Sequence, residues 1–108
     1  YGSGSSSITS NSCNYLCSGD AGEADAIKTT AVGSYGSTSP YGLADASGNV
    51  WEWCQDFFDE SGSIPASDAH AVRGGSWGNL PDDVKAGSRT AFKPDMALET
   101  VGFRIVSK

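Results

Sequence analysis

The sequence predicts a single α+β domain with short strands and little regular secondary structure. The candidate strands are only a few residues long, the segments between them are long and rich in Gly and Ser, and aromatic residues cluster in one stretch. A chain of 108 residues has room for one domain. A domain of this size buries only about two-thirds of its unfolded surface, so we expect aromatic residues, bound ions or a partner segment to hold the loops.

The chain begins with a tract of Gly, Ser and Thr over residues 1–12 that has no apolar periodicity. This composition is typical of a flexible linker or a poorly ordered end, so we place the domain at residues 13–108. Because the first residue is Tyr1 rather than Met, we expect a processed or excised piece of a longer chain.

The first regular elements are expected just before the middle of the chain. Leu43–Ser47 is predicted to form a helical turn, which Gly48 ends in the manner of a C-cap. Val50–Trp53 alternates between apolar and polar residues like a strand and begins the aromatic cluster.

Two further strands are predicted toward the C-terminus. One covers Ala71–Trp77, with a bend or bulge at Gly74 and Gly75, and the other covers Val101–Val106. Between them, Val84–Phe92 is expected to be a short helix or an irregular segment.

The core is expected to be aromatic, because few aliphatic side chains are present to bury area. The candidates are Trp51, Trp53, Trp77 and Phe103. Arginines in the same segments are expected to tie carboxylates or carbonyls inside the fold. These are Arg73, Arg89 and Arg104.

Charge is unevenly distributed along the chain, whose formal net charge is −6. Residues 1–60 hold eight acidic residues and one basic residue, whereas residues 61–108 hold five acidic and six basic residues. Binding to nucleic acid requires clustered Lys and Arg, so no nucleic-acid partner is expected. No apolar run approaches the roughly 20 residues of a membrane-spanning helix. The acidic half is either a solvated surface or a source of oxygen ligands for a hard cation such as Ca²⁺.

Cysteine and histidine are too few for the common metal and catalytic sites. The three cysteines, Cys13, Cys17 and Cys54, cannot all pair within the chain. Cys13 and Cys17 form either a small loop disulfide in an exported protein or two thiols in a cytosolic one. The lone His70, expected in a solvent-facing loop, has no partner at a zinc-ligand spacing and no serine pattern that would make a nucleophilic triad.

One stretch fits a calcium loop on its residues alone. A turn over residues 45–52 would bring the carboxylates of Asp45 and Glu52 together and direct the carbonyl oxygens of Gly48 and Val50 inward. The alternative is that Glu52 forms a buried ion pair with one of the three arginines named above.

Four motifs, in this order, resemble the C-terminal half of the formylglycine-generating-enzyme (sulfatase-modifying factor) family domain. They are YGLADASGNVWEW at 41–53, VRGGSW at 72–77, RTA at 89–91 and VGFRIV at 101–106. The resemblance covers residues 13–108. It implies a C-type-lectin-like fold of the formylglycine-generating-enzyme type, with short strands, little regular secondary structure and bound calcium.

The resemblance implies two calcium sites, so Ca²⁺ is the expected cofactor. In the second family site, the ligands are a side chain, two backbone carbonyls and a glutamate, which fall here on Asp45, Gly48, Val50 and Glu52. The first family site falls on Asn14, Tyr15, Asp25 and Ile27, once a one-residue insertion is assumed.

The chain departs from the family at the catalytic metal. Formylglycine-generating enzymes bind copper through two cysteines that follow the Gly-Gly-Ser motif, because thiolates suit Cu(I), and use it with oxygen to oxidise a substrate cysteine. The corresponding positions here are about Asn79 and Val84, and neither side chain can act as a thiolate. Copper and the sulfatase-activating reaction are therefore not expected.

Another branch of the family comprises the variable proteins of diversity-generating retroelements, in which the segment between RGGSW and GFR forms a ligand-binding face. Here that segment is Gly78–Val101, and whether it is diversified is open. The candidate binding residues have mixed chemistry and are Trp77, Asn79, Leu80, Asp82, Lys85, Met96, Leu98 and Glu99. Asp83 lies in the same segment and is one of its chemically varied side chains.

These features together predict a calcium-stabilised binding or display module that has lost copper-dependent oxidase chemistry; they favour a module that is not an enzyme but leave that question open. The expected partner is a protein or surface ligand, or the N-terminal half of the same domain on another chain. An extracytoplasmic location, or a cell or virion surface, is favoured. The alternative is a fragment of a metal-dependent oxidase or oxygenase of the same family, whose active residues lie partly outside this chain.

Overall fold

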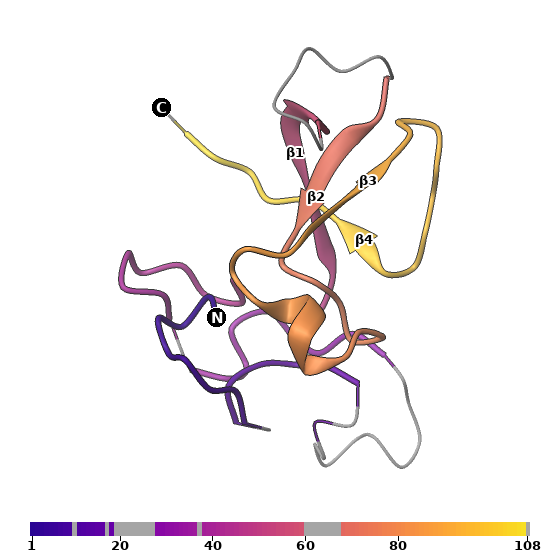
Figure 1. Ribbon diagram of the computed structural model, residues 1–108. Coiled ribbons are helices and arrows are strands. Elements are labelled where there is room, and N and C mark those ends of the chain that lie inside the picture. The colour runs from indigo at the N-terminus through magenta and orange to yellow at the C-terminus, as the bar shows by residue number, and fades with distance from the viewer. Residues whose placement is uncertain (10, 17, 19–27, 37, 60–67, 108) are drawn as a thin grey trace.

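The computed structural model describes residues 1–9, 11–16, 18, 28–36, 38–59 and 68–107. These residues form the elements β1 (Trp51–Phe57), β2 (His70–Arg73), the 3₁₀ helix η1 (Pro81–Val84), β3 (Arg89–Phe92) and β4 (Val101–Gly102). The strands make one sheet in the order β3-β2-β1-β4, in which β1 is antiparallel to β2 and parallel to β4. The irregular N-terminal segments and η1 lie at one end of this sheet (Figure 1).

Strand β1 is longer than the predicted Val50–Trp53, and it supplies the aromatic core. Trp51 is buried, as predicted, whereas Trp53 is half-buried and meets the ring of Phe92 edge-on at a centroid distance of 6.2 Å. The pairing of β1 with β2 becomes irregular between Trp53 and Phe57, which marks a bulge.

Strand β2 ends at Arg73, short of the predicted end at Trp77, because Gly74 and Gly75 take positive φ angles of 96° and 73°. A Cβ atom at Gly75 would overlap the side chain of Val84 and the carbonyl of Asp83. The bend at the glycines was therefore predicted correctly, and the missing side chain at Gly75 lets η1 pack closely against it.

The prediction of a short helix or irregular segment over Val84–Phe92 was wrong, because its second half is a strand. Arg89–Phe92 pairs with His70–Arg73 residue for residue, so a partner distant in sequence decides its conformation. His70 was expected in a solvent-facing loop, but it lies on β2, half-buried, with its ring 4.5 Å from that of Phe57.

The predicted strand over Val101–Val106 is regular only at Val101–Gly102. The prediction that Phe103 belongs to the core was wrong, since its exposed fraction is 76%, and Ile105 and Val106 are exposed as well. Beyond β4 the chain leaves the sheet and runs out to the C-terminus (Figure 1).

The buried apolar side chains of the described residues are Cys13, Trp51, Ala71, Val72 and Val84. This core is small: Trp51 lies on β1, Ala71 and Val72 on β2, Val84 at the end of η1, and Cys13 in the N-terminal segment. Trp77, predicted to be in the core, is only half-buried. Within the described ranges, no helix combines the length and apolarity needed to cross a membrane.

Candidate functional site

The four residues predicted for the second calcium site lie together. Asp45, Gly48, Val50 and Glu52 all line one cavity of about 220 Å³, beside Arg104 from the C-terminal segment. Two carboxylates, a guanidinium and nearby backbone groups therefore share one space, which the sequence spacing alone could not establish.

Arg104 binds both carboxylate oxygens of Glu52. Its Nε donates to Oε2 at 2.9 Å and its Nη2 donates to Oε1 at 2.7 Å. A third hydrogen bond runs from Nη2 to the carbonyl oxygen of Asp45 at 3.3 Å. The bond to Glu52 raises the pKa of the Arg104 guanidinium above its ordinary value. The predicted internal tie is thus confirmed for Arg104, but it is wrong for Arg73 and Arg89, which are exposed.

The loop before β1 has a conformation that excludes the predicted helical turn at Leu43–Ser47. Asp45 is in the left-handed region, with φ of 49°, and its Oδ2 accepts a hydrogen bond from the backbone N–H of Gly33. Ala44 instead pairs with Thr38 in an isolated antiparallel bridge. Asp is among the few non-glycine residues that tolerate a left-handed φ angle, and the hydrogen bond from Gly33 holds the Asp45 side chain in place.

The same loop is anchored to the glycine bend after β2. The N–H of Gly48 donates to the carbonyl of Gly74 at 2.7 Å, and the N–H of Trp77 donates to the carbonyl of Asn49 at 2.9 Å. These two bonds hold the GNVWEW and RGGSW motifs against each other, so the two motifs form one structural unit.

The donor set of this cavity fits a calcium ion. Carboxylate and carbonyl oxygens are the ligands that Ca²⁺ prefers. Each carboxylate oxygen has two lone pairs, so an oxygen of Glu52 that accepts one N–H of Arg104 can still coordinate a cation. No group of three or more His, Cys, Asp or Glu side chains suited to a metal occurs among the described residues, so backbone carbonyls would have to complete the coordination.

Half of the first predicted calcium site can be located. Asn14 is buried, and its Nδ2 donates to the carbonyl of Lys28 at 2.8 Å. The carbonyl of Asn14 accepts the N–H of Asn49, which ties this segment to the loop of the second site. The carbonyl of Tyr15 accepts the N–H of Ser18. The other two proposed ligands, Asp25 and Ile27, lie outside the described residues, as does Cys17.

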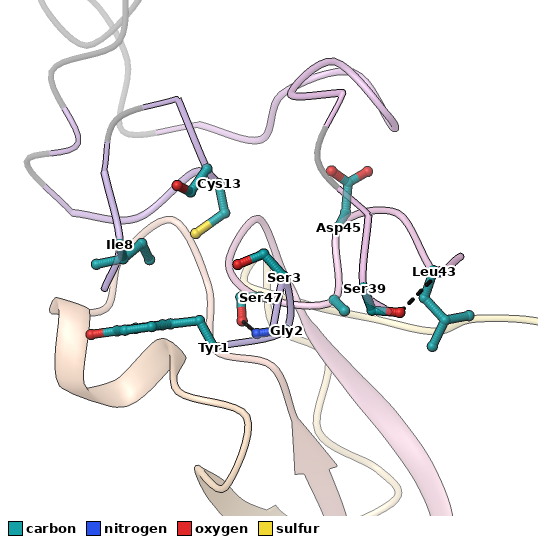
Figure 2. Close-up of a pocket in the computed structure, with 11 residues that line it drawn as sticks. Tyr1, Gly2, Ser3, Ile8, Cys13, Ser39, Leu43, Asp45 and Ser47 are labelled. Carbon is teal, nitrogen blue, oxygen red and sulfur yellow. Dashed lines mark hydrogen bonds between the residues drawn. The ribbon is translucent and has the colours of Figure 1, made fainter. Parts of the chain in front are cut away.

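A small hollow lies beside this segment, between the N-terminal residues and the loop before β1. Figure 2 shows the N–H of Gly2 donating to Ser47 Oγ, while the sulfur of Cys13 points toward the hollow. Its volume is about 10 Å³, which is room for about one water molecule. It is therefore a packing feature and not a ligand site.

The predicted ligand-binding residues are mostly exposed. The two half-buried members are Trp77 and Asn79, and the exposed members are Leu80, Asp82, Lys85, Met96, Leu98 and Glu99. Leu80 is the most exposed of the three apolar members, at 57%. The side-chain oxygen of Asn79 accepts hydrogen bonds from the N–H and the hydroxyl of Ser76, so Asn79 also has a structural role.

A second cavity, which we call the polar hollow, lies over η1 and β3 and has a volume of about 440 Å³. Its lining residues are Trp51, Asn79, Asp83, Ser88, Arg89, Thr90 and Phe92. Sequence reasoning assigned no ligand role to Ser88, Thr90 or Phe92. Their place at this cavity depends on the pairing of β3 with β2, which joins residues distant in sequence and which no local pattern in the sequence indicates.

Comparison with known proteins gives the chain a family context. Residues 3–108 match the family model described as the Sulfatase-modifying factor enzyme 1-like domain. Serine/threonine-protein kinase pkn1 of Chlamydia pneumoniae is 41% identical over an alignment of 88 residues, and the match covers 70% of this chain and 14% of that protein. Inactive C-alpha-formylglycine-generating enzyme 2 of Mus musculus is 31% identical over an alignment of 94 residues, and the match covers 82% of this chain and 29% of that protein.

A solved structure is similar over most of the chain. Treponema denticola variable protein 1 superposes with a TM-score of 0.69 at 30% identity, over 86% of this chain and 34% of that one. The chain spans well under half the length of each of these three proteins.

Proposed function

Since the chain belongs to the sulfatase-modifying factor enzyme 1-like family, we propose that it is a calcium-stabilised ligand-binding module without copper-dependent oxidase chemistry. The similarity to Treponema denticola variable protein 1 confirms the predicted α+β, C-type-lectin-like fold. The module's activity, cofactor and partners are proposals, argued below from the residues.

The observation that carries the proposal is the chemistry at the two positions that the family resemblance assigns to copper thiolates. At the first, the Asn79 carboxamide oxygen is 2.6 Å from the Ser76 hydroxyl and 3.0 Å from its N–H. At the second, Val84 is fully buried. An amide engaged in a turn and a buried isopropyl group offer no soft ligand for Cu(I).

Surface chemistry supports binding. Leu80, Met96 and Leu98 are large apolar side chains that are 57%, 42% and 40% exposed, and charged residues stand beside them. Apolar side chains rimmed by polar ones are typical of a protein interaction site. The name of the similar Treponema denticola protein, a variable protein, agrees with a binding face in this segment. We propose a protein or surface ligand as the partner.

Calcium is proposed as the stabilising ion of the cavity beside Arg104. Asp45, Glu52 and the carbonyls of Gly48 and Val50 would hold it, and Arg104 would orient Glu52 for coordination. The ion would compensate the one negative charge that remains in this cavity, where two carboxylates face a single guanidinium. We propose a location outside the cytoplasm or on a cell or virion surface, because extracellular calcium modules work at about 10⁻⁴–10⁻³ M calcium.

The second candidate function is a fragment of a metal-dependent oxidase or oxygenase. It is favoured by the 31% identity over 91 aligned residues to the formylglycine-generating enzyme of Streptomyces coelicolor, of which the chain spans only 29%. In that case the N-terminal half of the domain, on another chain, would be the partner and would supply the active residues.

Two experiments separate these candidates. The first supplies Cu(I) and a cysteine-containing peptide under oxygen; the binding module gives no peptide oxidation, and turnover would overturn it. The second measures capture of protein from a surface extract by the wild type and by Leu80→Ser with Met96→Ser. We expect the double variant to lose capture while its melting temperature is unchanged, because both side chains are exposed. Capture that survives would count against this face.

A further inference from the structure

The C-terminal arm, which we define as residues 103–107, exposes large apolar side chains beside the sheet. It follows β4, which is an edge strand in the order β3-β2-β1-β4, and it runs away from the sheet toward the C-terminus (Figure 1). Phe103, Ile105 and Val106 are 76%, 87% and 81% exposed. Apolar side chains that gather at this level of exposure are typical of an interaction surface.

The backbone of the arm is open as well. Among the described residues, no backbone hydrogen bond involves residues 104–107, whereas β4 pairs with β1 through Val101 and Gly102. Unpaired N–H and C=O groups at the edge of a sheet are a template for a further strand. The arm therefore offers both backbone groups and apolar side chains to a partner.

Arg104 holds the start of the arm in place. Its Nε and Nη2 donate to the carboxylate of Glu52, and Nη2 also donates to the carbonyl of Asp45. Arg104 is the only charged residue of the arm, and Glu52 balances its charge. A charged partner therefore finds no unbalanced charge on the arm, and an apolar, uncharged occupant such as a second arm is complementary to it.

The area of this apolar surface is enough for a second copy of the chain. Val32, which is 88% exposed, lines the same cavity as Phe103 and so extends the surface at the start of the arm. Burial of these four apolar side chains on each of two copies would remove on the order of 1,200 Å² of accessible surface, at about 150 Å² for each side chain. That area is at the lower end of the range for specific interfaces, about 1,200–2,000 Å².

We propose that the chain forms a homodimer in which the two C-terminal arms pair as antiparallel strands across a two-fold axis. Each arm satisfies backbone groups of the other and covers its apolar side chains. A two-fold contact between identical segments closes at two copies, so it leaves no arm open for a third. The proposal goes beyond the proposed function, because the candidate binding residues Leu80 and Met96 lie outside the arm.

Sedimentation velocity over a range of protein concentrations tests the proposal, in a reducing agent because Cys54 is a free thiol. We expect monomers and dimers in exchange, with a Kd on the order of 10 μM for an interface of this size. Ile105→Lys and Val106→Lys should each weaken the dimer by about tenfold or more, because each places an ammonium group without a partner in an apolar contact. Tyr41→Lys is the matched control at a side chain that is 90% exposed and lies outside the arm, and it should leave the Kd unchanged.

Added NaCl should strengthen the dimer, because salt screens the repulsion between two copies that each carry a net charge of −6 and leaves apolar contacts intact. Four results would overturn the proposal: a monomer at every concentration, species that grow beyond the dimer, an unchanged Kd in both arm variants, or an equal loss in Tyr41→Lys. A thermal melt of each variant confirms that it is folded. If capture through Leu80 and Met96 fails while the dimer forms, the binding-module function is wrong and the dimer stands.

Discussion

Removal of Arg104 should destabilise the fold far more than removal of a surface lysine at the same hydrogen-bond distance. Arg104 and Lys85 each approach their carboxylate partner to 2.7 Å. The difference is exposure: the side chains of Arg104 and Glu52 are each 28% exposed, whereas those of Lys85 and Asp82 are 53% and 85% exposed. Arg104→Ala would leave the Glu52 carboxylate without its partner in a cavity, and Lys85→Ala would leave Asp82 in water.

The size of the effect follows from this burial. Breaking a fully buried ion pair by removing one partner costs about 3–5 kcal/mol, and exposed pairs contribute about 0.2–1 kcal/mol. The Arg104 pair is intermediate in exposure and bidentate, so we expect Arg104→Ala to lower the free energy of unfolding by about 2 kcal/mol. For a domain of this size that corresponds to a fall in melting temperature of roughly 10 °C. Lys85→Ala should produce no measurable fall.

Urea denaturation and thermal melting, followed by circular dichroism in EDTA, measure both variants. EDTA is needed because a bound cation would compensate part of the charge left on Glu52. A double-mutant cycle with Glu52→Gln isolates the pair, and the coupling between the two positions should account for most of the loss. Equal stabilities for Arg104→Ala and Lys85→Ala would refute the reasoning.

The remaining predictions concern two positions, Gly75 and Cys54. Gly75→Ala should lower the free energy of unfolding by about 2 kcal/mol or more, because the strain of a positive φ angle and the overlap of the new Cβ atom with Val84 add together. In Gly42→Ala the φ angle is also positive but the space around it is open, so the free energy of unfolding should fall by about 1 kcal/mol. Equal losses in urea melts would contradict the packing role of Gly75. Burial raises the pKa of the Cys54 thiol above its ordinary 9.0, so iodoacetamide at pH 8 should alkylate Cys54 more slowly in the folded chain than in urea, as read by peptide mass mapping. Because the folded state keeps this proton longer than the unfolded state, stability should fall as pH rises past 9.0 toward the folded pKa, and the fall should be smaller in Cys54→Ser.

Local patterns predicted the features that depend on neighbours in sequence. The alternation that begins at Val50 placed a strand in the aromatic cluster and Trp51 in the core, and Gly74 and Gly75 marked the bend. The pairing of Glu52 with an arginine was an open alternative from charge alone. The structure selects Arg104 because β4 runs parallel to β1 and brings Gly102 opposite Glu52.

Features that depend on distant partners could not be predicted. Arg89–Phe92 is a strand because β2 lies beside it, and its own residues do not distinguish strand from irregular chain. Phe103 looked like core from its aromatic side chain, but no described segment covers it. The polar hollow is a consequence of the same pairing, since it brings Thr90 within one cavity with Asp83.

The central claim is that calcium stabilises this domain through Asp45 and Glu52, and differential scanning calorimetry in calcium and in EDTA tests it most directly. Calcium at about 100 times its Kd should add about 2.7 kcal/mol to the stability of the wild type. Asp45→Ala should melt lower in both media, because its carboxylate also accepts the N–H of Gly33, and it should lose the calcium-dependent rise. Glu99→Ala, an exposed control outside the cavity, should keep that rise. A wild type that melts at one temperature in both media, or a full calcium-dependent rise in Asp45→Ala, would contradict the claim.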